Sequence, residues 1–197
     1  MKSFSDSLTK AALGTLMSAV IVSAALSSQV NAREISDINV AEQIVINDNQ
    51  LQLNGAGVRS KFFIDLYVGS LYLTSPSHDL ANVLAAEESA VRLNITSGMI
   101  TSEKMHDAII EGFDDATDGN TQEIQVQIDA FMALFSEEII KGDQFTLVTS
   151  KSSGVTAYKN EVPQDTIKGE AFRQALLKIW LGDSPAQNSL KEEMLGK

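Results

Sequence analysis

Residues 58–73 form a long run in which both alternating sets of positions are largely apolar. One set contains Phe62, Ile64, Leu66 and Val68, and the other contains Phe63, Tyr67, Leu71 and Leu73. Successive side chains of a strand point to opposite faces of a sheet, so such a run can be buried only where both faces are covered. We therefore expect a central strand, or a bent pair of strands, inside a layered domain.

Turn-forming residues mark further strands on either side of this run. Ile44-Val45-Ile46 and Leu51-Gln52-Leu53 flank a turn-rich interval, which predicts a hairpin. The segment Asn54-Gly55-Ala56-Gly57 is interpreted as a tight passage where glycine supplies backbone angles that other residues resist. Further strands are expected at 91–96, at 145–150 and at 155–158, the last two forming a hairpin around Ser152-Ser153-Gly154.

Apolar residues at three- and four-residue spacing indicate helices between and after these strands. They are predicted around Asp79–Ala86, from an N-cap at Thr101 or Ser102 through Phe113, from Ile124 to Ile139, from Phe172 to Trp180, and in a last short helix holding Leu190 and Leu195. Gly142-Asp143 is expected to end the third of these, and Gly182 followed by Pro185 the fourth. The order of elements predicts an α+β fold, with helices packed on a mostly antiparallel sheet.

The charge and composition exclude several classes of function. The chain carries 26 acidic and 15 basic residues, a formal net charge of −11, and its basic residues are scattered singly, so nucleic-acid binding is not expected. It has no cysteine, which removes disulfides, thiolate nucleophiles and sulfur-ligated metals. Its two histidines, His78 and His106, have no partner at ligand spacing, so neither a metal site, a bound cofactor nor a nucleophilic triad is predicted.

The first 32 residues have the pattern of a secretory signal peptide. Lys2 and Lys10 precede a run of small and apolar residues at 11–26, and Val30-Asn31-Ala32 fits a cleavage site after Ala32. The alternative is a retained membrane anchor, but serines interrupt a run that is already short for a spanning helix. We expect an exported, periplasmic protein in which 33–197 form one domain, with no later stretch of spanning length.

Two sets of residues follow each other in the order found in a known family. The first set runs from Leu53 to Arg59 and continues from Phe63 to Leu73. The second set comprises Asp143–Phe145, Gly154–Thr156, Phe172–Leu176 and Ile179–Asp183. With these two sets the chain resembles the chalcone isomerase-like family, especially its exported bacterial members. The resemblance covers nearly all of 40–197, and it implies an open-faced sheet with helices layered on one side and a ligand cleft between them. Family members include plant isomerases that close a chalcone to a flavanone, plastid fatty-acid-binding proteins and non-catalytic relatives, so the fold alone leaves function open.

The resemblance also indicates which residues to examine. Arg59 matches the arginine with which the isomerases hold a phenolate and the developing anion, but the positions of their other polar groups fall at Tyr67, Thr101, Ala108 and Ile179. An enolate-like anion needs several donors, and losing one can lower the rate on the order of 100-fold. The fatty-acid-binding members pair such an arginine with a tyrosine of the neighbouring strand to grip a carboxylate. Arg59 and Tyr67 would face the same side of one unbroken strand.

These residues also have ordinary structural interpretations. Arg59 could pair with an acid such as Asp65, while Tyr67 and Trp180 could serve only to pack the core. We expect a non-catalytic periplasmic protein that binds a small apolar or carboxylate-bearing ligand such as a fatty acid, with Arg59 and Tyr67 as ligand-binding residues. Two alternatives stay open: an isomerase of the intramolecular lyase type acting through Arg59 with other helper groups, and an accessory envelope protein whose partner is another protein.

Overall fold

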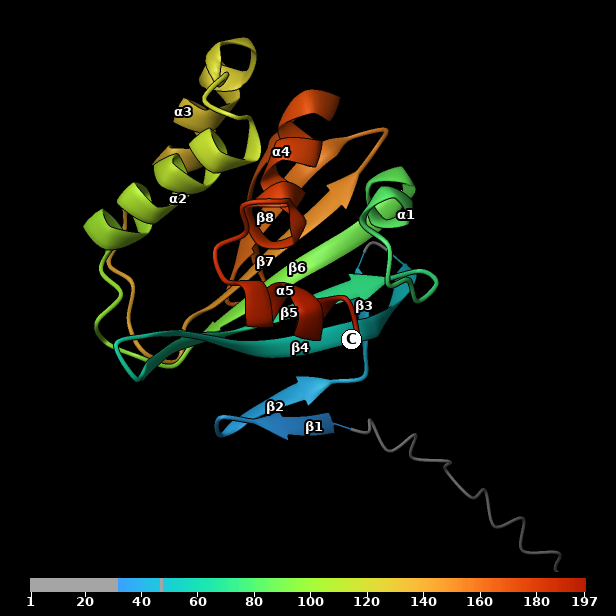
Figure 1. The fold of residues 1–197 in the computed structure, drawn as a ribbon, viewed down its shortest axis with the longest axis vertical. Coiled ribbons are helices and arrows are strands. Elements are labelled where there is room, and N and C mark those ends of the chain that lie inside the picture. Colours follow the sequence, from blue (N-terminus) through green and yellow to red (C-terminus); the bar gives the residue numbers. More distant parts are fainter. Residues whose placement is uncertain (1–31, 47) are drawn as a thin grey trace, which may run out of the picture.

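One antiparallel sheet dominates the computed structural model, which describes residues 32–46 and 48–197 (Figure 1). Its strands, hydrogen-bonded in sequence order, are β3 (Gln43–Ile46), β4 (Asn49–Lys61), β5 (Ile64–Leu73), β6 (Glu88–Ile95), β7 (Gln144–Ser150), β8 (Gly154–Lys159) and β9 (Val162–Ile167). A separate hairpin, β1 (Ala32–Ile35) and β2 (Ile38–Ala41), precedes it. The predicted signal segment lies outside the described residues apart from Ala32, which begins β1.

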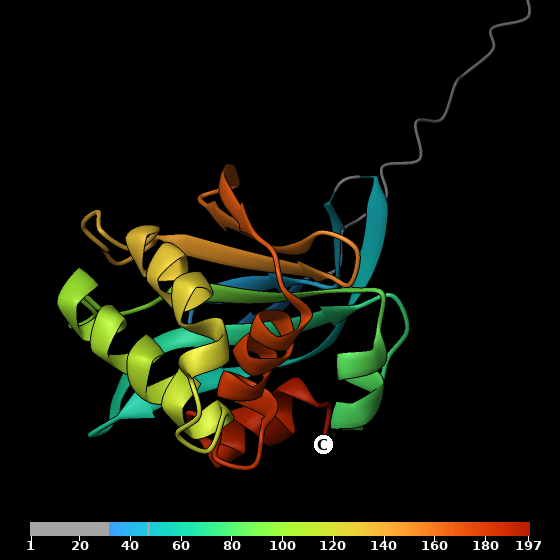
Figure 2. The same ribbon diagram turned by 90° about the horizontal axis from the view of Figure 1, so that it is seen from above.

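The helices lie on one side of the sheet, as seen from above in Figure 2. They are α1 (Leu80–Ala85), α2 (Ser102–Ala116), the short 3₁₀ helix η1 (Gln122–Ile124), α3 (Gln125–Ala133), α4 (Glu170–Leu181) and α5 (Asn188–Met194). The predicted α+β fold, an antiparallel sheet with a layer of helices, is confirmed. No helix in the described part of the chain has the length and apolar character needed to cross a membrane.

The helix ends follow the capping residues. The Thr101 hydroxyl accepts the Lys104 N–H at 3.2 Å and begins α2, and the Asp79 carboxylate does the same for the Asn82 N–H at the start of α1. These bonds satisfy amide groups that have no partner within the helix. The Gly182 N–H donates to the Lys178 carbonyl at 2.8 Å and ends α4, as the sequence predicts.

The helix predicted to continue to Ile139 ends at Ala133 instead. The segment that follows has a competing use for its backbone: the Gly142 N–H donates to the Ile95 carbonyl, and the Asp143 carbonyl accepts the Ile95 N–H, both at 2.9 Å. Phe135 and Ile139 remain buried without being helical. The prediction was wrong because the spacing of apolar residues indicates only that they are buried. It gives no sign that the backbone of this segment pairs with the end of β6.

Residues 58–73 form a bent pair of strands, the second of the two expected forms. β4 and β5 pair directly through the two-residue turn Phe62-Phe63, and both of these residues have positive φ angles, 52° and 65°. These two phenylalanines are exposed, although the alternating pattern places them in a buried run. The β1–β2 hairpin packs on the face opposite the helices, where Val40, Ala56 and Val68 share a buried cluster. The central pair is thus covered on both faces.

Gly55 and Gly57 lie within β4, and neither has a positive φ, so the interpretation as a tight passage was wrong. Their missing side chains allow α5 to approach the sheet. A Cβ on Gly55 would lie 2.0 Å from the Glu193 carbonyl oxygen, and one on Gly57 would lie 1.6 Å from the Glu193 carboxylate. The first clash is with backbone, whereas the second is with the Glu193 side chain, chiefly its flexible end and more weakly its Cβ at 2.8 Å.

A buried arginine of α4 forms an ion pair within its own helix and also joins α4 to α1. Arg173 has no exposed surface, and its guanidinium donates to Glu170 at 2.6 and 2.7 Å and to the Leu84 carbonyl of α1 at 2.5 Å. The hydrogen bonds that Glu170 accepts, chiefly those from Arg173, lower the pKa of this carboxyl to about 2. An unpaired buried guanidinium is strongly unfavourable, so the half-exposed carboxylate is needed to keep Arg173 inside.

Gly55→Ala should lower the free energy of unfolding by about 2 kcal/mol or more, because the backbone of α5 must move away from β4. Gly57→Ala should cost less, and adding Glu193→Ala should recover part of that loss, because it removes the carboxylate but keeps the Glu193 Cβ, which lies 2.8 Å from the new Cβ. Gly98→Ala is the matched control, since a Cβ there meets nothing within 4 Å. Urea denaturation of the unmodified protein and of the four variants measures these losses. Equal losses for Gly55→Ala and Gly98→Ala would contradict the close approach of α5.

The Glu170 carboxylate predicts a dependence of stability on pH. Its pKa is about 2 in the folded chain against an ordinary value of 4.5 for a free glutamate, so its contribution is complete above a pH of about 5 and is lost as the pH falls toward about 2. Glu170→Gln should remove this part of the acid sensitivity and should destabilise the protein by roughly 1–3 kcal/mol at neutral pH. Urea denaturation across this pH range tests it; parallel curves for the two proteins would contradict it.

Candidate functional site

Arg59 and Tyr67 stand directly opposite each other on the neighbouring strands β4 and β5. Residues in such a pair project from the same face of the sheet, and here it is the helix-covered face, since Tyr67 belongs to the core cluster beneath α4. The expected shared face is therefore present, but through pairing across a turn and not through even spacing along one strand. We call this pair the Arg59–Tyr67 site.

The Tyr67 side chain is buried and hydrogen-bonded to the helix layer. Its hydroxyl oxygen accepts the indole N–H of Trp180, on α4, at 3.0 Å. Burial raises the pKa of the Tyr67 hydroxyl, and it outweighs the opposing effects of the Trp180 hydrogen bond and the Arg59 charge. Tyr67 is thus a neutral phenol at physiological pH, and it retains an O–H proton to donate.

The Arg59 guanidinium is half-buried and is positioned by the segment that leads into α5. Its Nη1 donates to the Gln187 side-chain oxygen at 3.0 Å and to the Ser60 carbonyl at 3.1 Å. The Gln187 oxygen also accepts the Ser60 N–H, and its amide nitrogen donates to the Val58 carbonyl, each at 3.0 Å. Gln187 therefore binds the β4 backbone on both sides of Arg59. Sequence reasoning missed it, because an isolated glutamine before a short helix belongs to no recognisable motif.

The alternative pairing of Arg59 with Asp65 does not occur. The Asp65 carboxylate accepts hydrogen bonds from Ser60 and Ser36, both at 2.8 Å. Within residues 32–46 and 48–197, no carboxylate lies within ion-pair distance of Arg59, and none of these residues accepts a hydrogen bond from its Nε or Nη2. The guanidinium charge is held in place without a protein counter-ion in this part of the chain.

The positions that correspond to the isomerases' other polar groups have structural roles here. The Thr101 hydroxyl caps α2, and Ala108 lies on the exposed face of that helix. Ile179 packs so closely against Gly112 that a Cβ on Gly112 would lie 2.8 Å from the Ile179 Cγ2. Ala108 and Ile179 have no polar side-chain atoms. Arg59 and Tyr67 are therefore the polar members of this set that the fold brings together.

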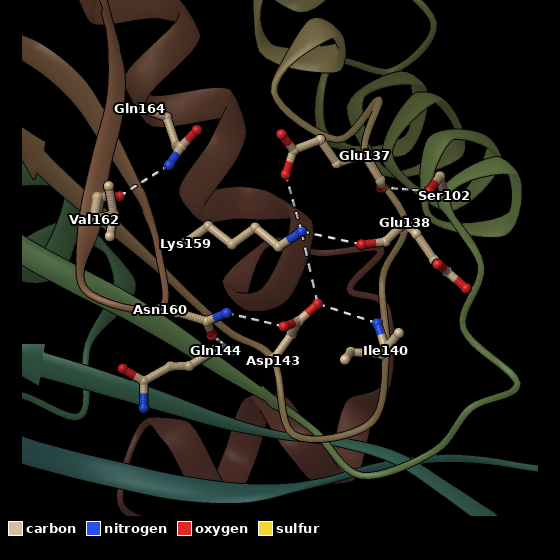
Figure 3. A network of polar contacts seen from close by, with 10 residues as sticks. All are labelled: Ser102, Glu137, Glu138, Ile140, Asp143, Gln144, Lys159, Asn160, Val162 and Gln164. Carbon is tan, nitrogen blue, oxygen red and sulfur yellow. Dashed lines mark hydrogen bonds and ion pairs between the residues drawn. The ribbon is translucent and has the colours of Figure 1, made fainter.

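Two surface cavities lie away from the Arg59–Tyr67 site. One, of about 570 Å³, lies between α2 and η1–α3 and is lined by acidic residues with an apolar floor. The other, of about 450 Å³, lies beside Lys159. Figure 3 shows that the Lys159 ammonium group points at the Glu137 and Asp143 carboxylates and at the Glu138 carbonyl. Asn160 also donates to Asp143 at 2.9 Å, so this network is internally paired and holds the 137–143 segment.

These contacts also set the charge state of Asp143. Burial alone would raise the pKa of this carboxyl, but the hydrogen bonds from Asn160, the Ile140 N–H and Lys159 lower it overall. Among the described residues no group of three or more His, Asp or Glu side chains is arranged to hold a metal ion. Neither cavity combines a cation that has no carboxylate partner with a neutral hydrogen-bond donor, as the Arg59–Tyr67 site does.

A sequence profile of chalcone isomerase-like proteins matches residues 32–196. The chain belongs to the chalcone isomerase-like family. The crystal structure of a fatty-acid-binding protein from Arabidopsis thaliana superposes with a TM-score of 0.58 at 14% sequence identity, covering 78% of this chain and 96% of that one. A search of curated proteins found no match. The resemblance read from the sequence is confirmed, and the chalcone isomerase-like fold is shared with this plant protein.

In this chalcone isomerase-like protein, Tyr67→Phe should leave the buried Trp180 N–H without its acceptor and lower the free energy of unfolding by roughly 1–3 kcal/mol. Trp180 is the only tryptophan, so its fluorescence emission should also shift. Tyr158→Phe, on the opposite face of the sheet, is the control. Urea denaturation and fluorescence spectra measure both changes; a Tyr67→Phe spectrum identical to that of the unmodified protein would contradict the hydrogen bond.

Proposed function

We propose that this protein binds a small amphiphile with a carboxylate group, such as a fatty acid, without catalysing a reaction on it. The observation that supports this most directly is the Arg59–Tyr67 site itself. It combines a half-buried guanidinium that has no carboxylate partner in the described chain with a neutral phenol on the adjacent strand. We also propose a periplasmic location, which rests on the signal-like pattern of residues 1–32.

The two side chains suit a carboxylate for separate reasons. A guanidinium remains charged and presents a planar set of N–H donors that matches two carboxylate oxygens. Tyr67 adds an O–H donor that carries no charge of its own. Hydrogen bonds to a charged group contribute about 1.5–3 kcal/mol each, so this pair can hold an acid selectively over a neutral alcohol or ester.

In this proposal the ligand enters by displacing the Gln187 side chain from Arg59. Its side-chain oxygen accepts from Arg59 in the structure, so it occupies an acceptor position that a ligand oxygen could take. The region over Tyr67 is packed by Trp180, so an aliphatic tail requires the α4–α5 connection to shift outward. The tail would then lie among the apolar side chains between the sheet and α4, where burial contributes about 0.8 kcal/mol per CH₂ group.

The isomerase alternative gains no support from the same positions. Thr101 uses its hydroxyl in the helix cap, and Ala108 and Ile179 provide no donor. A developing enolate would meet Arg59 and Tyr67 alone, and each missing donor lowers the rate on the order of 100-fold. Binding a stable carboxylate makes no such demand.

Arg59→Gln should weaken binding of palmitate by roughly 10- to 100-fold, because the substitution removes the charge that faces the carboxylate. Arg92→Gln is the matched control: Arg92 is also half-buried, but it lies on the opposite face and bonds to Thr146. The protein is purified gently from the periplasm, and native mass spectrometry detects co-purified acids and measures added palmitate.

A small acid that is retained by the unmodified protein and by Arg92→Gln, but lost from Arg59→Gln, would support the proposal. Palmitate affinity that is absent, or the same in all three proteins, would refute it. Added chalcone provides the comparison with the isomerase alternative: cyclisation well above the spontaneous rate, lost in Arg59→Gln, would assign catalysis to the site instead.

A further inference from the structure

Exposed large apolar side chains gather at one end of the sheet. The described part of the chain has nine of them, and six share this end: Phe62, Phe63, Ile64, Met99, Ile140 and Val162. We call these six residues the apolar end. The remaining three, Val45, Ile110 and Val126, are single residues on β3, α2 and α3. Scattered exposed apolar residues need no explanation, but three consecutive ones at a single hairpin tip, Phe62 to Ile64, call for one.

The antiparallel topology places all six residues at the same end of the sheet. β4 ends and β5 begins at this end, β6 ends here, β7 begins, β8 ends and β9 begins. Hydrogen bonds at these strand ends agree with this placement, since the Thr96 N–H donates to the Leu66 carbonyl of β5 and the Asn160 N–H to the Gln144 carbonyl of β7. Figure 1 shows the β4–β5 tip projecting at the left edge of the sheet.

The β4–β5 turn contains residue types that its backbone angles disfavour. Three hairpins in the described chain have a two-residue turn with both φ angles positive, at Ser36-Asp37, Phe62-Phe63 and Asn160-Glu161. Such turns favour glycine, asparagine and aspartate, and bulky residues are disfavoured there. Phe62 and Phe63 are 80% and 107% exposed, so the core does not explain them either. Neither turn geometry nor burial accounts for two aromatic side chains at the tip.

The charges around this end differ from those of the helix layer. Lys61 adjoins the tip, with its ammonium group 5.9 Å from the Phe62 ring. The end is nearly neutral, with five Lys or Arg and six Asp or Glu in 59–65, 96–104, 136–144 and 159–163. By contrast, 105–133 contain seven acidic residues and no Lys or Arg. An anionic surface would therefore be repelled by the α2–α3 segment but not by the apolar end.

We propose that the apolar end docks on the surface of a lipid bilayer, with Phe62 and Phe63 inserted at the level of the headgroups and Lys61 against lipid phosphates. A projecting tip of aromatic residues with an adjacent lysine fits an interface that is apolar beneath and anionic above. The proposal goes beyond acid binding and does not require it. It would place Arg59, three residues from the tip, close to the membrane in which fatty acids reside.

The sharpest test replaces the aromatic pair with the residues that the turn prefers. Phe62→Asn with Phe63→Gly should keep or improve folding, so a loss of binding is not a loss of structure, and urea denaturation verifies this. Val45→Ser is the control, because Val45 is 70% exposed and lies on β3, away from the apolar end. The full-length purified proteins are sedimented with vesicles of phosphatidylethanolamine and phosphatidylglycerol, and with vesicles of phosphatidylcholine.

The unmodified protein and Val45→Ser should sediment with the vesicles, and the double variant should bind at least about tenfold more weakly. Lys61→Glu should weaken binding to the phosphatidylglycerol vesicles more than to phosphatidylcholine. An unmodified protein that stays in solution, or a double variant that binds equally well, would overturn the proposal. So would light scattering that shows the aromatic pair joins two copies of the chain while vesicles go unbound.

Palmitate binding by the double variant separates this proposal from the preceding one. The Arg59–Tyr67 site is left intact, so affinity measured by native mass spectrometry should match that of the unmodified protein. Vesicle binding can then be lost while acid binding is retained, and an absence of acid binding in every variant would not bear on the vesicle result.

Discussion

The burial of the β4–β5 pair on both faces is the constraint from which the other features follow. On one face the strands meet the helices, and on the other they meet the β1–β2 hairpin and the cluster around Tyr72. A slip of one residue would exchange the two faces, so covering both fixes the register strongly. That register sets Arg59 opposite Tyr67 and places the turn at Phe62-Phe63.

The sequence predicts the elements whose signals are local. The two covered faces of 58–73, the Thr101 cap and the Gly182 stop depend on neighbouring residues, and the structure agrees with them. β9 was missed because it is mostly exposed and contains Pro163, so it lacks alternating apolar residues. The role of the β4 glycines was misread because it depends on Glu193, far along the chain. Long-range docking leaves no pattern in a local window.

The same distinction applies to the Arg59–Tyr67 site. The family resemblance drew attention to Arg59 and Tyr67, and the hairpin brings them together. What surrounds them could not be predicted: Trp180 bonds to Tyr67 across 113 residues, and Gln187 reaches Arg59 across 128. Both hydrogen bonds depend on how α4 and the segment leading into α5 pack on the sheet. A shared fold therefore says less about ligand chemistry than the few side chains that the helix layer brings over it.

The uneven placement of acidic residues along α2 and α3 gives the molecule a permanent electric dipole moment. Near a negatively charged surface, such a dipole experiences a torque before any contact forms. Orientations that keep the acid-rich segment away from such a surface would then be favoured, among them those that present the β4–β5 tip to it. Productive encounters would then outnumber random ones at low ionic strength, and the advantage would fade as salt shortens the screening length to about 8 Å.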